Sequence, residues 1–288
     1  MPKADFIDLA RASARGFSER PRIAIAAEAR YVSQRQPSGL ALALARSGRH
    51  PVLLDPRDLA GSCLLDVDLL VARGRSPDLF DLLERAESLG IATVNRRSAI
   101  AAVVDKASMA HALATAGIPT PATRVGSFDA IARSCCPSDF PLVLKPVFGD
   151  NARGVRVVWT RDELSRVAWH EPQVIAQPFL PSDGFDLKLY VAGAEVHAVR
   201  KPSPLAPDRD LESRPVQVTP ALRALALRCG LLFGLELFGV DCVETARGPV
   251  VIEVNDFPNY TAVRGADEGL ARFVVDRAER LLRSGSDA

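Results

Sequence analysis

Short apolar runs alternate with helical segments through roughly the first 95 residues, and this alternation restricts the fold more than any other feature. Four apolar runs are typical of buried strands, at residues 21–27, 51–55, 67–72 and 91–94. Helices are predicted at residues 38–47, with Ser38 as the N-cap, and at 79–89. Strands that alternate with helices predict a parallel α/β sheet. No Gly-x-Gly-x-x-Gly follows the first run, so no dinucleotide site is expected there.

Composition narrows the class of protein. The 288 residues can bury a large core and form several lobes, and 48% hydrophobic with 25% charged residues is typical of a globular chain. The net charge of +1 argues against a dedicated nucleic-acid surface. No apolar run reaches the ~18 residues that a membrane span needs. Residues 1–22 lack the apolar core of a secretory signal, so a cytoplasmic location is expected.

Two acidic positions near the C-terminus fall on a predicted hairpin, with strands at residues 240–244 and 250–254. Side chains alternate along a strand, so Glu253 and Asn255 point the same way, and the hairpin can bring Asp241 beside them. Two carboxylates and an amide oxygen form a hard, oxygen-only site suited to Mg²⁺. The alternative is an ordinary polar hairpin edge, and the pattern alone does not separate the two.

Lysine is scarce in this chain. Only five of the 36 basic residues are lysines, namely Lys3, Lys106, Lys145, Lys188 and Lys201. A chain that uses arginine by default and retains lysine at a few positions suggests that a compact ammonium is needed there, as it often is against phosphate. Chance retention is the alternative.

The middle of the chain combines lysines with a glycine-bounded loop. Asp105 is placed to cap a helix that starts at Lys106, and Lys145 lies in a strand at residues 142–146. The loop between Gly149 and Gly154 joins this strand to the next, so its N–H groups could close over a phosphate. Glycine loops between strands are, however, mostly turns. A further strand at residues 174–179 could present backbone groups to a purine edge.

A second strand pair carries more charge. Its first strand places three polar side chains on one face, those of Asp186, Lys188 and Tyr190. A hairpin around Gly193 returns the chain and brings Arg200 and Lys201 to the far end. The alternative is a half-exposed sheet with a solvated face. Residues 202–215, rich in proline and charge, are a candidate lid.

In their joint order, these features resemble the ATP-grasp superfamily along nearly the whole chain, and most closely the RimK-like carboxylate–amine ligases. The matching motifs are Asn95, Asp105-Lys106, the segment 117–123, Lys145-Pro146, the loop 149–154, Asp186-x-Lys188, and Asp241 with Glu253-x-Asn255.

The resemblance implies a role for each matching residue. Lys188 faces the γ-phosphate and the reacting carboxylate, supported by Arg200 or Lys201. Asp241, Glu253 and Asn255 hold one or two Mg²⁺ ions, which Mn²⁺ could replace. The other residues contact ATP: Lys106, Lys145, Gly149, Asp150, Asn151, Gly154, Gln177, Pro178, Phe179, Leu180 and Asp186.

The resemblance also implies an α/β ATP-grasp fold, with an N-terminal lobe at residues 1–98, a central lobe at 99–180 and a C-terminal lobe at 181–288. The implied activity is ATP- and Mg-dependent amide formation between a carboxylate and an amine, through an acyl phosphate, with release of ADP and phosphate. Its substrates are expected to be amino acids or peptides, and homo-oligomers are common in the superfamily. Asn259, Tyr260 and Arg264 either select the substrate or serve only in turns and packing.

Two alternatives compete with the ligase. Residues 185–191, 199–203 and 253–260 also resemble the inositol polyphosphate kinases of the same superfamily, which phosphorylate a hydroxyl. Arg153 and Asn259 depart from that pattern, since those kinases typically have histidine near the first position and glycine near the second. The other alternative is a non-catalytic nucleotide-binding protein, whose sign would be a missing metal ligand or phosphate lysine.

Overall fold

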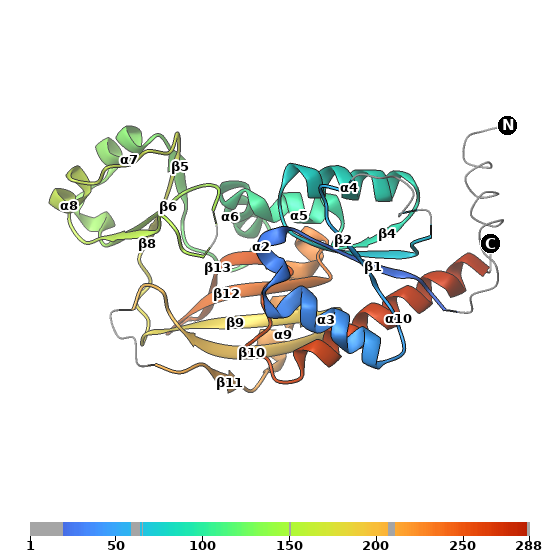
Figure 1. Cartoon of the computed structure of the whole chain (residues 1–288). Helices are drawn as coiled ribbons and strands as arrows, with labels where there is room; N and C mark the ends of the chain where they lie inside the picture. Colours follow the sequence, from blue (N-terminus) through green and yellow to red (C-terminus); the bar gives the residue numbers. More distant parts are fainter. Residues whose placement is uncertain (1–19, 59–63, 65, 150, 207–210, 287–288) are drawn as a thin grey trace. The chain divides into compact units, whose positions relative to one another are not determined.

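The computed structural model describes residues 20–58, 64, 66–149, 151–206 and 211–286 (Figure 1). The chain divides into two compact units. The first comprises Met1–Ile100, Gly234–Leu237 and Asp256–Ala288, and the second comprises Ala101–Phe233 and Phe238–Asn255. The three lobes expected from the sequence stay a prediction.

A four-stranded parallel sheet with the order β2-β1-β3-β4 forms the centre of the first unit. Its strands are β1 (Ile23–Ala27), β2 (Val52–Leu54), β3 (Leu69–Arg73) and β4 (Ala92–Val94). Both β1 and β3 are buried along their whole length, as the continuous apolar runs in the sequence predict. The parallel α/β sheet is therefore confirmed.

Helices pack around this sheet. They are α2 (Ala29–Val32), α3 (Arg35–Arg46), α4 (Pro77–Ser88) and α10 (Ala266–Ser286), while α5 (Arg97–Val104) crosses from the first unit into the second. The sequence determines the start of α4 clearly, because the Ser76 hydroxyl accepts a hydrogen bond from the Leu79 N–H (3.3 Å) and Pro77 follows it. Helix α10 packs along α3 (Figure 1), where Arg46 of α3 pairs with Glu268, and Arg49, three residues after the end of α3, pairs with Glu279.

The predicted cap at Ser38 is wrong. Ser38 lies inside α3, where its hydroxyl donates to the Val32 carbonyl at 2.7 Å. The helix is interrupted at Gln36, whose φ and ψ are not helical, and the fully buried Gln36 side chain donates to Asp267 and accepts from the Tyr260 N–H. These partners are more than 200 residues away, so local sequence could not reveal them.

The second unit contains two sheets. A five-stranded sheet has the order β11-β10-β9-β12-β13, and a four-stranded sheet has the order β5-β8-β6-β7. The first consists of β9 (Phe185–Ala192), β10 (Glu195–Pro202), β11 (Arg214–Val216), β12 (Leu237–Thr245) and β13 (Gly248–Asp256). The second consists of β5 (Arg124–Gly126), β6 (Leu142–Lys145), β7 (Arg156–Val158) and β8 (Val174–Pro178). Both predicted hairpins, β9–β10 and β12–β13, are thus confirmed.

Helices of the second unit begin where capping residues predict. They are α6 (Lys106–Thr115), α7 (Phe128–Ser134), α8 (Arg161–Ser165) and α9 (Pro220–Phe233), with a 3₁₀ turn at Pro137–Asp139. The Asp105 carboxylate accepts from the Ala107 and Ser108 N–H groups at 2.8 and 2.9 Å, which confirms the predicted cap. No described helix combines the length and the apolar composition that a membrane crossing requires.

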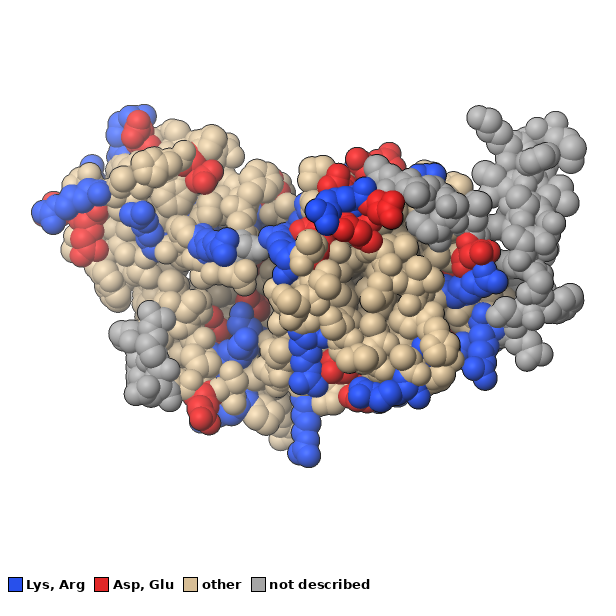
Figure 2. All heavy atoms as spheres, viewed as in Figure 1, with Lys and Arg blue, Asp and Glu red and all other residues tan. Residues whose placement is uncertain are grey.

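Charges of both signs are interspersed on the face seen in Figure 2. Oppositely charged side chains of this protein also form ion pairs, such as Arg22–Asp66 and Arg30–Glu28, each at 2.7 Å. This mixture agrees with the small net charge of the sequence.

Candidate active site

The strand pair β9–β10 separates the predicted site residues onto two faces. Lys201 stands opposite Asp186, and Val199 stands opposite Lys188. Residues directly opposed across antiparallel strands share a face, so Lys188 and Lys201 lie on the same side of the sheet. Arg200 stands opposite Leu187 and therefore lies on the other side. The structure thus brings Lys201, and not Arg200, to the face of Lys188.

Asp241 connects this face to the β12–β13 hairpin. Its carboxylate accepts a hydrogen bond from Lys188 Nζ at 2.7 Å, and the side-chain amide of Asn255 approaches the same oxygen at 3.4 Å. Burial by itself would lower the pKa of Lys188, but the Asp241 charge and hydrogen bond outweigh it, and the pKa is raised. Lys188 is therefore a cation at every physiological pH.

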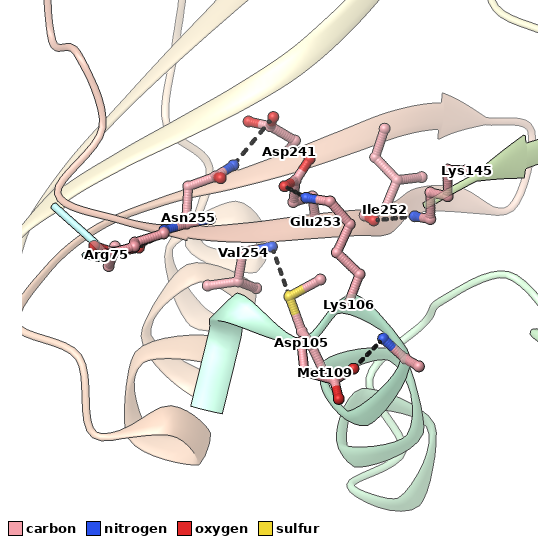
Figure 3. Close-up of polar contacts among 12 residues, drawn as sticks. Arg75, Asp105, Lys106, Met109, Lys145, Asp241, Ile252, Glu253, Val254 and Asn255 are labelled. Carbon is pink, nitrogen blue, oxygen red and sulfur yellow. Dashed lines mark hydrogen bonds and ion pairs between the residues drawn. The ribbon is translucent and has the colours of Figure 1, made fainter. Parts of the chain in front are cut away.

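Glu253 lies on the neighbouring strand and pairs with a different lysine. Its carboxylate forms an ion pair with the ammonium of Lys106, a residue that is only 6% exposed (Figure 3). The backbone N–H of Lys106 donates to the Val147 carbonyl at 3.1 Å, which ties the start of α6 to the segment after β6. Each of the two predicted carboxylate ligands is thus paired with a lysine ammonium group.

Lys145 approaches the same hairpin from β6. Its ammonium donates to the Ile252 carbonyl at 3.2 Å (Figure 3). Burial lowers its pKa to about 8, Glu253 opposes this shift, and the nearby Lys106 adds to it. Three of the five lysines, Lys106, Lys145 and Lys188, therefore converge on β12 and β13.

Asp186 is a buried acid on the face of Lys188. Burial raises its pKa, while a hydrogen bond from Ser203 and the charge of Lys188 oppose the shift. Lys201, half-buried nearby, has a lowered pKa because burial and the charge of Lys188 disfavour its protonated form. The two lysines of this face are thus shifted in opposite directions.

Arg200 has different surroundings. Its guanidinium pairs with Asp183 and with Glu244, the latter at 2.8 Å, and lies 4.9 Å from the centre of the Phe185 ring. Glu244 is three residues beyond Asp241 in β12, and so points to the opposite face. The described contacts of Arg200 therefore lie on the face opposite to Lys188.

The predicted adenine segment lies at the end of β8. Gln177 is buried, and its side-chain amide donates to the Thr123 hydroxyl at 2.8 Å. The Phe179 N–H donates to the Pro141 carbonyl at 2.9 Å, and its ring lies 5.4 Å from that of Trp159. Pro178 is exposed and Leu180 is half-buried. Sequence reasoning did not identify Thr123 as a partner of Gln177, although Thr123 ends one of the matching motifs.

The glycine loop adopts the backbone that its sequence favours. Gly149 and Gly154 have φ of +154° and +74°, and Asn151 and Ala152 have φ of +53° and +56°. Two consecutive non-glycine residues in the left-handed region are uncommon and are found mostly at turns and functional loops. Asp150 lies outside the described residues.

The donor set fits a hard cation. Among the described residues no three His, Cys, Asp or Glu side chains cluster, so the candidate set is two carboxylates and one amide. Asp241 and Asn255 are in contact, and Glu253 projects from the same face of β13 as Asn255. A flip of the Asn255 amide would turn its oxygen toward a bound ion. Oxygen donors of this kind suit Mg²⁺.

Comparison with known proteins identifies the family. Residues 103–272 match the model of the RimK-like ATP-grasp domain, which is more than half of the chain. This chain belongs to the RimK-like ATP-grasp family, and the predicted fold and the class of ATP-dependent carboxylate–amine ligase are thereby confirmed.

Relatives agree with this assignment. A probable alpha-L-glutamate ligase of Maridesulfovibrio salexigens is 27% identical over 218 residues, which cover 71% of this chain and 72% of that protein. The ligase of the same name from Aliivibrio fischeri is 27% identical over 237 residues, covering 76% and 79%. A RimK domain ATP-grasp protein of Sphaerobacter thermophilus has a similar structure, with a TM-score of 0.72, 26% identity, and coverage of 88% of this chain and 99% of that one.

D-Alanine–D-alanine ligase of Bacillus anthracis, solved with ATP, superimposes with a TM-score of 0.67 over 93% of this chain and 100% of its own. Its 19% identity shows a shared fold alone. Taken together, the comparisons favour the ligase over the kinase and over the non-catalytic alternative.

Proposed function

We propose that this protein joins the carboxylate of one substrate to the amine of another amino acid or peptide, with ATP, through an acyl phosphate. The observation that carries the proposal is one sheet face that combines the cations Lys188 and Lys201 with the acids Asp241 and Glu253 and with Asn255. Anion must attack anion in the first step, so a site for it needs cations and metal-binding oxygens together.

Asp241, Glu253 and Asn255 would hold Mg²⁺, or Mn²⁺ in its place. Once bound, the ion supplies charge neutralisation for the phosphates of ATP. Lys188 and Lys106 pair with the two carboxylates. Binding of Mg²⁺ with ATP would exchange those partners, because each lysine can turn from a carboxylate to a phosphate oxygen.

Lys188 and Lys201 would orient the reacting groups. A carboxylate oxygen of the first substrate attacks the γ-phosphorus, the bond to the bridging oxygen breaks, and ADP leaves. The amine nitrogen then attacks the acyl carbon, phosphate leaves with its electron pair, and the nitrogen loses a proton to yield the amide. Asp241 raises the pKa of Lys188 before ATP binds, and the anionic phosphate oxygens that would then replace Asp241 favour the same charged form.

Lys106, Lys145 and the loop from Gly149 to Gly154 would bind the phosphates. The loop supplies backbone N–H donors, with Asn151 in its middle and Asp150 beside it. The segment Gln177, Pro178, Phe179 and Leu180 would line the adenine site, with Asp186 close to it. These roles follow from the family resemblance and are compatible with the hydrogen bonds around Gln177 and Lys145.

The amine substrate we propose to test first is L-glutamate, because several relatives carry the name probable alpha-L-glutamate ligase. Asn259, Tyr260 and Arg264 remain candidates for selecting it. Tyr260 is buried and its N–H bonds to Gln36, so packing is its main role, whereas Arg264 is exposed.

The test is product stoichiometry. Purified protein with ATP, Mg²⁺, L-glutamate and a pool of small carboxylates and peptides should yield ADP and free phosphate in equal amounts, only when both substrates are present. ADP without free phosphate would mean transfer to an acceptor and would replace the ligase by a kinase. A Glu253→Gln variant is the matched control, since it keeps the shape of the side chain and removes its charge.

A further inference from the structure

Asn95 is a buried polar side chain outside the candidate active site, and both ends of its amide are hydrogen-bonded. It is 1% exposed and follows β4 directly. Its amide oxygen accepts from the backbone N–H groups of Glu236 and Leu237 at 2.8 and 2.9 Å, and its amide nitrogen donates to the Leu237 carbonyl at 2.6 Å. One side chain thus satisfies three backbone groups of two consecutive residues, Glu236 and Leu237, in a distant segment of the chain.

Glu236 and Leu237 stand at the start of β12. Leu237 is the first residue of β12, and Asp241 lies four residues further along the same strand. The Leu237 carbonyl also accepts from the Phe257 N–H at 2.9 Å, two residues beyond Asn255 and just past the end of β13. Asn95 therefore bonds to the first residue of one hairpin strand and, through that residue, to the chain leaving the other.

Register matters here because of the alternation of side chains. A shift of one residue along a strand moves every side chain to the other face. In β12 such a shift would exchange Asp241 for Cys242 on the face of Lys188, and a smaller displacement would spoil the approach of Asp241 to Asn255. We propose that Asn95 is a positioning residue, which fixes the β12–β13 hairpin so that Asp241 and Asn255 meet in the geometry that a divalent cation requires. This inference rests on the proposed function.

The charges nearby do not provide a substitute. Glu236 pairs with Arg277 at 2.9 Å and Asp256 pairs with Arg75, so both hairpin ends have additional side-chain contacts. Those pairs engage side chains, whereas Asn95 engages the backbone itself. A pair of side chains can shift by changing rotamers at both partners, whereas the bonds to Asn95 hold the backbone groups of Glu236 and Leu237 themselves, next to the ladders that β12 forms with β9 and β13.

The test is Mn²⁺ affinity, measured by electron paramagnetic resonance in the presence of ADP, on the full-length protein. Outer-shell partners of metal ligands commonly change metal affinity roughly 10–100-fold, and Asn95→Ala is expected to weaken Mn²⁺ binding by that factor. Asn95→Asp is a second variant, for use if Asn95→Ala folds poorly. It keeps an oxygen that can accept from Glu236 and Leu237 but removes the N–H group that donates to the Leu237 carbonyl, so it should also weaken Mn²⁺ binding.

Thr93→Val is the matched control. Thr93 is buried in β4, two residues before Asn95, and its hydroxyl donates to Glu87 at 2.7 Å without reaching β12. This variant loses a buried hydrogen bond of the same unit but should bind Mn²⁺ within about twofold of the wild type. An Asn95 variant that binds Mn²⁺ as Thr93→Val does would overturn the positioning role.

Asp241→Asn, measured in the same assay, distinguishes failure of the proposed metal site from failure of the positioning role of Asn95. Weak Mn²⁺ binding by Asp241→Asn together with normal binding by the Asn95 variants overturns the positioning role alone. Normal binding by Asp241→Asn contradicts the metal site of the proposed function, and the inference falls with it.

Discussion

The two faces of the five-stranded sheet differ in what their charges do. On one face, Lys188 pairs with Asp241 near Asn255, and Lys201 is half-buried beside them. On the other face, Arg200 pairs with Asp183 and Glu244, and the side chain of Cys242 in β12 is fully buried. Lys201 and Arg200 are adjacent in sequence, so strand alternation alone places one on the face of the proposed site and the other on the opposite face. A positive charge in this segment is therefore not enough to predict a role in the proposed site.

The two faces should differ most in how kcat changes when a single carboxylate is replaced by its amide. Asp241→Asn and Glu253→Gln are each expected to lower kcat by at least about 10²–10³-fold, since they remove charge that stabilises the phosphoryl-transfer step. Glu244→Gln, on the opposite face of β12, should leave kcat within about threefold. Steady-state ADP release by all three variants measures this, and a Glu244→Gln defect equal to that of Asp241→Asn would break the comparison.

Lys201 and Arg200 allow a sharper comparison of the two faces, because they are neighbours in the sequence. Lys201→Met should reduce kcat by about 10²-fold, because it removes a positive charge from the face where the substrates react. Arg200→Met should keep most of its activity and lose about 1 kcal/mol of unfolding free energy, as expected for a partly exposed ion pair. Parallel kinetics and urea denaturation test both. If Arg200→Met lost activity without losing stability, the assignment of faces would be reversed.

Lys145 and Lys188 should differ in their effect on stability as the pH changes. The pKa of Lys145 falls to about 8 in the folded protein, below the unfolded value of 10.5. The unfolded chain therefore binds more protons between these values, and the free energy of unfolding should rise through that window, by about 1–2 kcal/mol from pH 7.5 to 9.5. Lys145→Met should lack this rise.

Urea denaturation of both proteins at the two pH values provides the measurement. The stabilisation is fully present above pH 10.5 and is lost as the pH falls through about 8. Lys188, whose pKa is raised, cannot produce a change in this window. An equal rise in Lys145→Met would assign the effect to another group.

The smallest expected effect concerns the face of the five-stranded sheet that carries Arg200 and Cys242, opposite the face of Lys188. Cys229 of α9 and Cys242 of β12 are fully buried, and burial raises the pKa of the Cys229 thiol to about 12. Both should resist alkylation by iodoacetamide in the native protein, whereas Cys136 is exposed and should react without loss of activity. Peptide mass spectrometry before and after unfolding measures each site separately. Rapid native alkylation of Cys242 would show that this face is open.

Local patterns predicted much of this molecule. The buried strands, the cap at Asp105 and the pairing of the two hairpins follow from periodicity and capping chemistry, which act over a few residues. The meeting of Asp241 with Asn255 also follows, because a hairpin brings nearby residues together.

Features that depend on contacts between residues far apart in the sequence could not be predicted from local patterns. The side of the sheet that Arg200 occupies depends on the register of β10 with β9, which the sequence around Gly193 does not determine alone. The Asn95 contacts span more than 140 residues, and the interruption of α3 at Gln36 depends on Asp267. Such contacts are absent from any local window, which is why the partners of Asn95 and the error at Ser38 emerged only from the structure.

The most direct test of the central claim follows an oxygen atom. If this face activates a carboxylate with ATP, a substrate labelled with ¹⁸O in its carboxylate should pass one labelled oxygen to each phosphate released, because the C–O bond of the acyl phosphate breaks when the amine attacks. Mass spectrometry of the phosphate, with Glu253→Gln as the inactive control, gives the answer. One ¹⁸O per phosphate is the predicted result, and amide formed with unlabelled phosphate would contradict the account.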